Sequence, residues 1–274
     1  MGTNSTILKG TPWTVMEPPN PFLTLNCIWG SAGNNIYAGG KETTDGRILL
    51  YNGTSWGIDY TFVGSGSELK GIWGADASNV YAAGSSSSGY AVVLKRAGAN
   101  NWVFSYTSNP TSATFYGIWG YDNSNMYAWG LWPAGEGRVA RFNGSIWTGN
   151  DFTDSSSSIY GVWGPDAANI YAAGVNDTGG VVYKRGTGTM GAGNWGVFKQ
   201  FTAGDAVSLH SIWGTSSSDI FVSCYDGKVV HYDGSTWSIT AVLGAGYDLL
   251  SIWGISATDV YSVSRDGHII RYNP

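Results

Sequence analysis

The 274-residue sequence predicts an all-β protein, a six-bladed β-propeller with four antiparallel strands in each blade. A triplet of Ile or Val, Trp and Gly recurs six times at intervals of 40 to 50 residues. Eight positions after each of these tryptophans comes another aromatic residue, preceded by Asn or Asp and an aliphatic residue. Turn residues divide every copy into short strands. The six tryptophans are Trp29, Trp73, Trp119, Trp163, Trp213 and Trp253.

The fifth copy shows the strand pattern of one repeat. Four apolar segments, separated by turn residues, lie at 208–214, 219–224, 228–232 and 236–242. Asp-Gly pairs before the third and fourth segments are typical of tight turns between antiparallel strands. Four such strands in about 45 residues are characteristic of a propeller blade. We call these strands A to D, from the central axis outward.

The two ends of the chain are predicted to share one blade. The last copy reaches Pro274 before any strand D. At the other end, the segment from Gly10 to Trp13 aligns with the one from Gly53 to Trp56, which begins strand D of the first copy. We therefore expect a strand at about 10–16 to complete the C-terminal blade and remove a free sheet edge. Residues 1–274 would then form a single domain.

The turns between strands C and D carry a family resemblance. The segments 51–56, 142–147 and 232–237 read YNGTSW, FNGSIW and YDGSTW. These segments resemble degenerate forms of the Asp-box turn of sialidase-like and photosystem-assembly-factor-like propellers. The Trp-rich repeat is also similar in architecture to tachylectin-type and fungal fucose-lectin propellers. The resemblance implies a fold and says little about activity.

Composition excludes several classes of partner. Only 12% of the residues are charged, against about 25% in an average protein, and the net charge is −5. Without a basic cluster, nucleic acid is not an expected partner. No run of 18 apolar residues predicts insertion into a membrane, and the first residues lack the pattern of a signal peptide. The uncharged, Ser- and Gly-rich composition nevertheless favours an extracellular or periplasmic location. We expect a monomer.

No pattern of catalytic or cofactor-binding residues is present. Cys27 and Cys224 fall in different blades, so we expect two free, unreactive thiols. No metal-ligand spacing or phosphate-binding loop occurs. The arginines and glutamates do not assemble the acid, nucleophile and arginine cluster of a sialidase-like glycoside hydrolase. The sequence therefore predicts a protein that is not an enzyme and carries no cofactor or metal.

Most aromatic residues are predicted to be structural. Twelve of the 14 tryptophans occupy repeated positions, six on strand A and six at the start of strand D. Buried aromatic side chains at such positions suit packing between blades. Ligand contacts are better sought three residues before each strand-A tryptophan, near the entrance to the central channel. These mouth positions are Asn26, Lys70, Tyr116, Tyr160, His210 and Leu250.

The loops between strands B and C differ from blade to blade, whereas the A–B turns do not. They contain six to eight residues, counting the flanking glycines, in the first four copies and shrink to Asp-Gly hairpins in the last two. Because B–C and D–A loops share one face, which we call the B–C face, we expect ligand to bind there, above the first four blades. Trp132 lies in the third loop, close to Glu136 and Arg138, and is predicted to be an exposed anchor.

Two binding functions remain open. Repetition favours a lectin-like, carbohydrate-binding propeller, since several weak sites would gain from multivalency on a glycan-coated surface. A protein-interaction or structural scaffold is the alternative, because the mouth positions differ in chemistry and Trp132 has no counterpart in the other copies. We expect a glycan or protein ligand held by Trp132, Tyr116, Tyr160, Glu136 and Arg138, with Lys70, His210 and Asn26 nearby.

Overall fold

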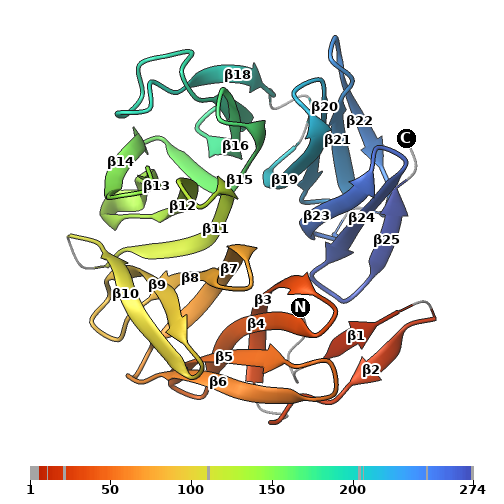
Figure 1. Cartoon of the computed structure of the whole chain (residues 1–274). Coiled ribbons are helices and arrows are strands. Elements are labelled where there is room, and N and C mark those ends of the chain that lie inside the picture. Colours follow the sequence, from red (N-terminus) through yellow and green to blue (C-terminus); the bar gives the residue numbers. More distant parts are fainter. Residues whose placement is uncertain are drawn as a thin grey trace. The chain divides into compact units, whose positions relative to one another are not determined.

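The computed structural model describes residues 6–10, 12–20, 23–109, 112–202, 205, 207–244 and 246–272. Almost all regular structure is β-strand (Figure 1). By its internal packing the chain divides into two compact units, residues 1–128 and 129–274, and the boundary falls inside β12 (Asn125–Leu131). The single domain over 1–274 stays a prediction.

Three blade sheets begin in the first unit, each an antiparallel meander in chain order. The first is β3 (Leu23–Ala32), β4 (Asn35–Glu42), β5 (Asp45–Tyr51) and β6 (Trp56–Phe62). The second is β7 (Glu68–Asp76), β8 (Asn79–Ser85), β9 (Ala91–Gly98) and β10 (Asn101–Thr107). The third is β11 (Thr114–Asp122), β12, β13 (Gly137–Phe142) and β14 (Trp147–Asp154), with a 3₁₀ turn, η1 (Pro133–Gly135), before β13.

The second unit holds the remaining three blade sheets. The fourth is β15 (Ser157–Asp166), β16 (Asn169–Asn176), β17 (Gly179–Lys184) and β18 (Gly196–Gln200). The fifth is β19 (Leu209–Ser216), β20 (Asp219–Cys224), β21 (Lys228–Tyr232) and β22 (Trp237–Ala241). The sixth is β23 (Leu249–Ser256), β24 (Asp259–Ser264) and β25 (Ile269–Tyr272). The all-β class and the six blade sheets are confirmed.

The repeated aromatic pair joins strands A and B of one blade. Trp29 of β3 lies directly opposite Tyr37 of β4, and their stacked rings are 6.4 Å apart. In four of the six copies, the glycine after the tryptophan receives the tryptophan of the preceding blade. A Cβ added to Gly74 would lie 2.7 Å from Cη2 of Trp29, and one added to Gly254 would lie 2.8 Å from Cη2 of Trp213. The Trp-Gly dipeptide thus fixes how neighbouring blades pack within each unit.

Buried aspartates add a second contact between blades. Asp59 of β6 accepts a hydrogen bond of 2.8 Å from the indole Nε1 of Trp102, on strand D of the next blade. Asp151 of β14 accepts one of 2.9 Å from Nε1 of Trp195 and two more, each of 2.9 Å, from Arg185. Because both carboxylates are almost fully buried, these bonds hold the outer strands of two blade pairs together.

The N-terminal segment forms a hairpin in the first unit. β1 (Ile7–Lys9) pairs only with β2 (Thr14–Met16) among the described strands. The predicted closing strand, about 10–16, contains β2, and Thr11 within it lies outside the described residues. The sixth sheet shows three described strands. Among the described residues, β2 does not pair with β25. Closure of the C-terminal blade by this segment therefore stays a prediction.

Deleting residues 1–16 should destabilise the protein. Ile7 is buried against Leu23, Leu25 and Leu49, and Met16 packs on the same cluster. Losing the Ile7 side chain alone exposes apolar surface worth about 2 kcal/mol or more. Thermal unfolding followed by circular dichroism should therefore show a lower midpoint. Deletion of residues 1–5, which precede the hairpin, is the control, and an unchanged midpoint after the longer deletion would contradict the prediction.

The two cysteines are free, as predicted. Cys27 lies on β3 beside Gly39, and Cys224 ends β20. Burial raises the pKa of each thiol to about 12. Because the thiolate is the nucleophilic form, neither thiol is activated at neutral pH.

Candidate functional site

Most mouth positions lie at an irregularity of the inner strand. In β3, pairing with β4 skips from Leu25 to Cys27, which leaves Asn26 as the extra residue. The same shift occurs at Lys70, Tyr160, His210 and Leu250. A β-bulge bends its strand and redirects the extra side chain. A β-bulge in the inner strand of five blades thus presents side chains of different chemistry.

In the first unit, two mouth positions belong to an ionic cluster centred on Glu68. Asn26 Nδ2 donates to Glu68 Oε1 at 3.0 Å and to the carbonyl of Leu69 at 2.9 Å. Lys70 Nζ lies 3.0 Å from Glu68 Oε2, and Lys41 Nζ lies 3.5 Å from Oε1. Burial opposes ionisation of Glu68, but hydrogen bonds and charge from Lys70, with support from Asn26 and Lys41, hold its pKa below the ordinary value.

Glu68 brings Asn26 and Lys70 together in this cluster, and neither Glu68 nor Lys41 was among the predicted site residues. Glu68 is the first residue of β7 in the second blade, and Lys41 lies at the end of β4 in the first blade, next to the B–C loop. Lys41 is exposed, so part of the positive charge faces solvent. Tyr116 of β11 is half-buried in the same unit.

In the second unit, two mouth positions form an aromatic stack. The rings of Tyr160 and His210 lie 5.5 Å apart and almost parallel, at 3°. Tyr225, in the B–C hairpin of the fifth blade, meets the His210 ring edge-on at 5.3 Å. Arg265 lies over the Tyr225 ring at 5.8 Å and pairs with Asp248 at 3.2 Å. An exposed guanidinium beside half-buried aromatic rings is an arrangement suited to protein ligands.

Acidification should destabilise the protein through His210. Burial lowers the pKa of His210, and the charge of Arg265 adds to this, against opposing effects of the Leu250 backbone and Asp248. The unfolded state therefore binds a proton more readily, and stability falls as pH drops below about 6.5. Urea unfolding at pH 7 and pH 5 should show a smaller loss for His210→Gln than for the wild type. Equal losses would exclude a contribution from this imidazole.

Trp132 corrects the sequence analysis. The sequence predicts an exposed anchor, yet Trp132 is only 2% exposed. The 3₁₀ turn that begins at Pro133 folds the loop back, with the Trp132 amide donating to the Glu136 carbonyl at 2.8 Å. Arg138 covers the indole at 5.4 Å and binds Glu136 at 2.8 Å. The predicted trio does come together, but burial of a large apolar ring makes Trp132 a packing residue.

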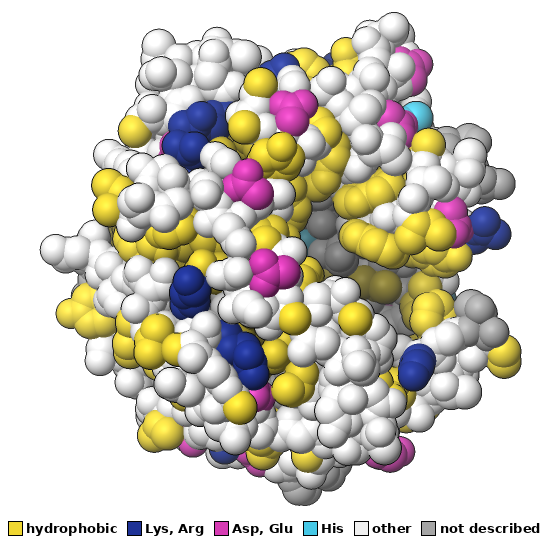
Figure 2. All heavy atoms as spheres, in the orientation of Figure 1, with side chains coloured by type: hydrophobic (Ala, Val, Ile, Leu, Met, Phe, Trp, Pro, Cys, Tyr) yellow, Lys and Arg dark blue, Asp and Glu magenta, His cyan; other side chains and the backbone are white. Residues whose placement is uncertain are grey.

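Charged side chains of both signs are scattered over the face shown in Figure 2. Within the described residues, no group of three or more His, Cys, Asp or Glu side chains is placed to hold a metal ion. None of the described helical segments is long and apolar enough to cross a membrane.

Of the comparisons with known proteins, only the search of solved structures found matches. No protein family model and no curated protein matches the chain. Among solved structures, YCF48 bound to D1 peptide matches with a TM-score of 0.50 and 12% identity, over 97% of this chain and 98% of that one. The WD40 β-propeller domain of Doa1 matches at 0.66 and 12%, over 99% and 82%. The C-terminal WD40 domain of Sif2 matches at 0.63 and 14%, over 99% and 76%.

These identities show the fold alone, and the fold is that of a β-propeller. The predicted architecture is thereby confirmed, and the likeness to photosystem-assembly-factor propellers extends to a solved structure. Specific likeness to lectin propellers does not appear among these three structures.

Proposed function

We propose that this chain is a non-enzymatic propeller that binds a protein or peptide through its B–C face. The observation that carries this proposal is the set of bulged mouth positions, which presents one different side chain per blade. Repeated sugar sites would need repeated chemistry, whereas a peptide has a different residue at each contact. The solved YCF48 structure, a propeller with a bound peptide, supports the same choice.

Two surfaces are candidates for the contact. The first unit offers Lys70 and Lys41 around a half-buried carboxylate, which suits an acidic group on the ligand. The second unit offers Tyr160, Tyr225 and the exposed Arg265, which suit an aromatic or acidic residue. An extracellular or periplasmic location is part of the proposal and rests on composition alone.

Selection from a random peptide library, followed by titration of synthetic peptides, tests the proposal. Arg265→Ala or Lys70→Ala should weaken a selected peptide by about tenfold or more, as expected for an interface anchor. Ile255→Ala is the control, because Ile255 is exposed at the A–B end of the sixth blade. If no peptide is enriched, or if every enriched peptide ignores both substitutions, the B–C face is not the binding site.

Carbohydrate binding on this face was the first expectation from sequence and has less support. The mouth positions differ in chemistry, and the buried Trp132 offers no ring for a sugar to stack on. A carbohydrate site is therefore better sought away from the mouth positions.

A further inference from the structure

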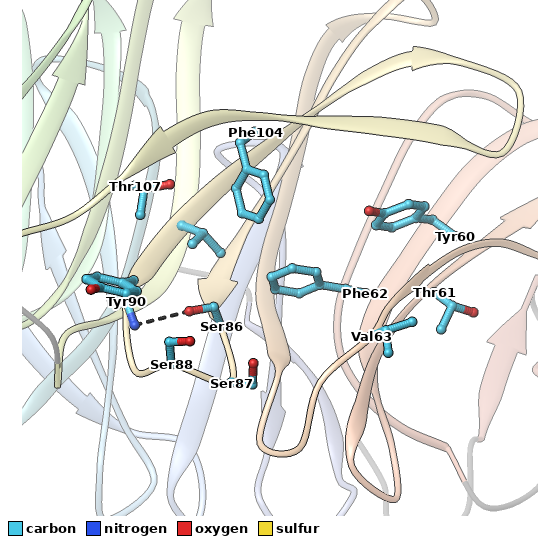
Figure 3. A pocket seen from close by; sticks show the side chains of 11 residues that line it. Tyr60, Thr61, Phe62, Val63, Ser86, Ser87, Ser88, Tyr90, Phe104 and Thr107 are labelled. Atoms are coloured by element: carbon cyan, nitrogen blue, oxygen red, sulfur yellow. Dashed lines mark hydrogen bonds between the residues drawn. The ribbon is translucent and has the colours of Figure 1, made fainter.

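A cavity of about 450 Å³ lies in the first unit, away from the mouth positions. It is bounded by β6 of the first blade, by β9 and β10 of the second, and by the loop between β8 and β9 (Figure 3). Its volume falls within the range of about 300–1,000 Å³ that is usual for small-ligand pockets. The cavity thus has the size of a binding site at the outer edge of two blades.

An exposed aromatic ring stands at the rim of this cavity. Phe104 of β10 is 59% exposed and points towards Phe62 of β6, with the ring centroids 5.8 Å apart (Figure 3). Phe62 and Val92 are buried and form the floor. Core packing explains the floor but not Phe104, most of whose surface remains in water. One face of this ring is therefore available to a ligand.

The lining is rich in hydroxyl groups and carries no charge. Seven of the eleven lining residues are Ser, Thr or Tyr, and the other four are Phe or Val. A charged ligand would lose its hydration without finding a partner among these eleven residues. A purely apolar ligand would bury hydroxyl groups without hydrogen bonds. The lining suits a neutral ligand that has both C–H faces and hydroxyl groups.

The serine loop that forms one wall is held in place by its own hydrogen bonds. The Ser86 and Gly89 amides donate to the Tyr90 and Ser86 carbonyls, each at 2.9 Å, and the Tyr90 amide donates to Ser86 Oγ at 3.2 Å. Gly89 has a φ of +77°, which an L-residue rarely adopts. The neighbouring Ser87 and Ser88 are exposed at the cavity. This wall is therefore preformed, with two hydroxyl groups available to a ligand.

We propose that this cavity binds a neutral saccharide. The C–H face of the sugar packs on the Phe104 ring, whose negative π-face attracts C–H groups. Hydroxyl groups of Ser87, Ser88 and Thr107 exchange hydrogen bonds with those of the sugar. The site lies on the B–C side of the first two blades, at their outer strands, and is separate from the mouth positions of the proposed function. Its chemistry excludes sugars that depend on a carboxylate or sulfate group.

A glycan array containing neutral, sialylated and sulfated glycans provides the first measurement, made on the full chain. We expect retention of neutral glycans, followed by saturable binding of the best glycan in isothermal titration. Phe104→Ala should weaken that binding by about tenfold or more. Ser88→Trp, which places an indole in the cavity from an exposed position, should abolish binding. Both positions are exposed, so the variants should melt like the wild type.

Val103→Ala is the matched control, because Val103 is exposed on the same strand but does not line the cavity. It should leave affinity within about twofold of wild type. Absence of neutral glycan binding, preference for charged glycans, or binding unaffected by Phe104→Ala and Ser88→Trp would each overturn the proposal. A peptide whose binding depends on Lys70 or Arg265 should bind Phe104→Ala normally, so the two proposals can fail separately.

Discussion

Replacing Asp151 with alanine should lower the free energy of unfolding by about 3–5 kcal/mol. The carboxylate is 3% exposed and accepts hydrogen bonds from Trp195 and, through two nitrogens, from Arg185. Its removal leaves a buried indole N–H without this acceptor and takes from the Arg185 guanidinium a carboxylate that binds it through two nitrogens. Urea unfolding monitored by tryptophan fluorescence and circular dichroism measures the loss.

Two further variants define the origin of this effect. Asp177→Ala removes an exposed carboxylate from the B–C loop of the fourth blade and should change stability by no more than about 0.5 kcal/mol. Asp151→Asn keeps an oxygen acceptor for Trp195 but removes the charge that faces Arg185, so its loss should be intermediate. A loss below about 1 kcal/mol for Asp151→Ala would show that the bonds between these outer strands contribute little.

Replacing Trp132 with alanine should cost about 3–5 kcal/mol in folding free energy. An exposed anchor at this position, as the sequence predicts, would give a change near zero. The structure reverses that expectation because the indole is buried under the Arg138 guanidinium, so truncation leaves a cavity. Equilibrium unfolding in urea, with the native fold checked by circular dichroism, separates the two outcomes.

The control for Trp132 is another aromatic truncation at an exposed position. Tyr121→Ala at the end of β11 should stay within about 0.5 kcal/mol of the wild type. Arg138→Ala should cost less than Trp132→Ala, since it removes a cation–π contact and a partly exposed ion pair but leaves the indole in place. If Trp132→Ala and Tyr121→Ala have the same free energy of unfolding, the sequence-based prediction that Trp132 is exposed is right after all.

The architecture could be predicted from the sequence because the blade motif recurs six times. Strand order in each blade depends on local signals, namely turns and alternating apolar residues, which recur six times. The turn motifs behave as local structure predicts, since Asn52 Oδ1 accepts the amides of Thr54 and Ser55. The pairing of Trp29 with Tyr37 follows from a fixed eight-residue separation across one hairpin. Comparing copies was enough to find these features.

The sites depend on contacts that no repeat encodes. Asn26, for example, binds Glu68 42 residues away in the sequence. The mouth positions were found because they keep a fixed offset from a repeated tryptophan. Their partners Glu68, Tyr225 and Arg265 keep no common offset, and neither does the burial of Trp132.

The sequence by itself therefore determined the β class, the number of blades and the residues that pack neighbouring blades, because short-range turns and periodicity specify each of these. Only tertiary structure decided which side chains remain available to a ligand. Phe104 stays exposed although its ring meets Phe62 of the neighbouring blade, and Trp132 is buried because its loop folds back and Arg138 covers the indole. These outcomes depend on how side chains pack in three dimensions, which the repeat pattern does not specify.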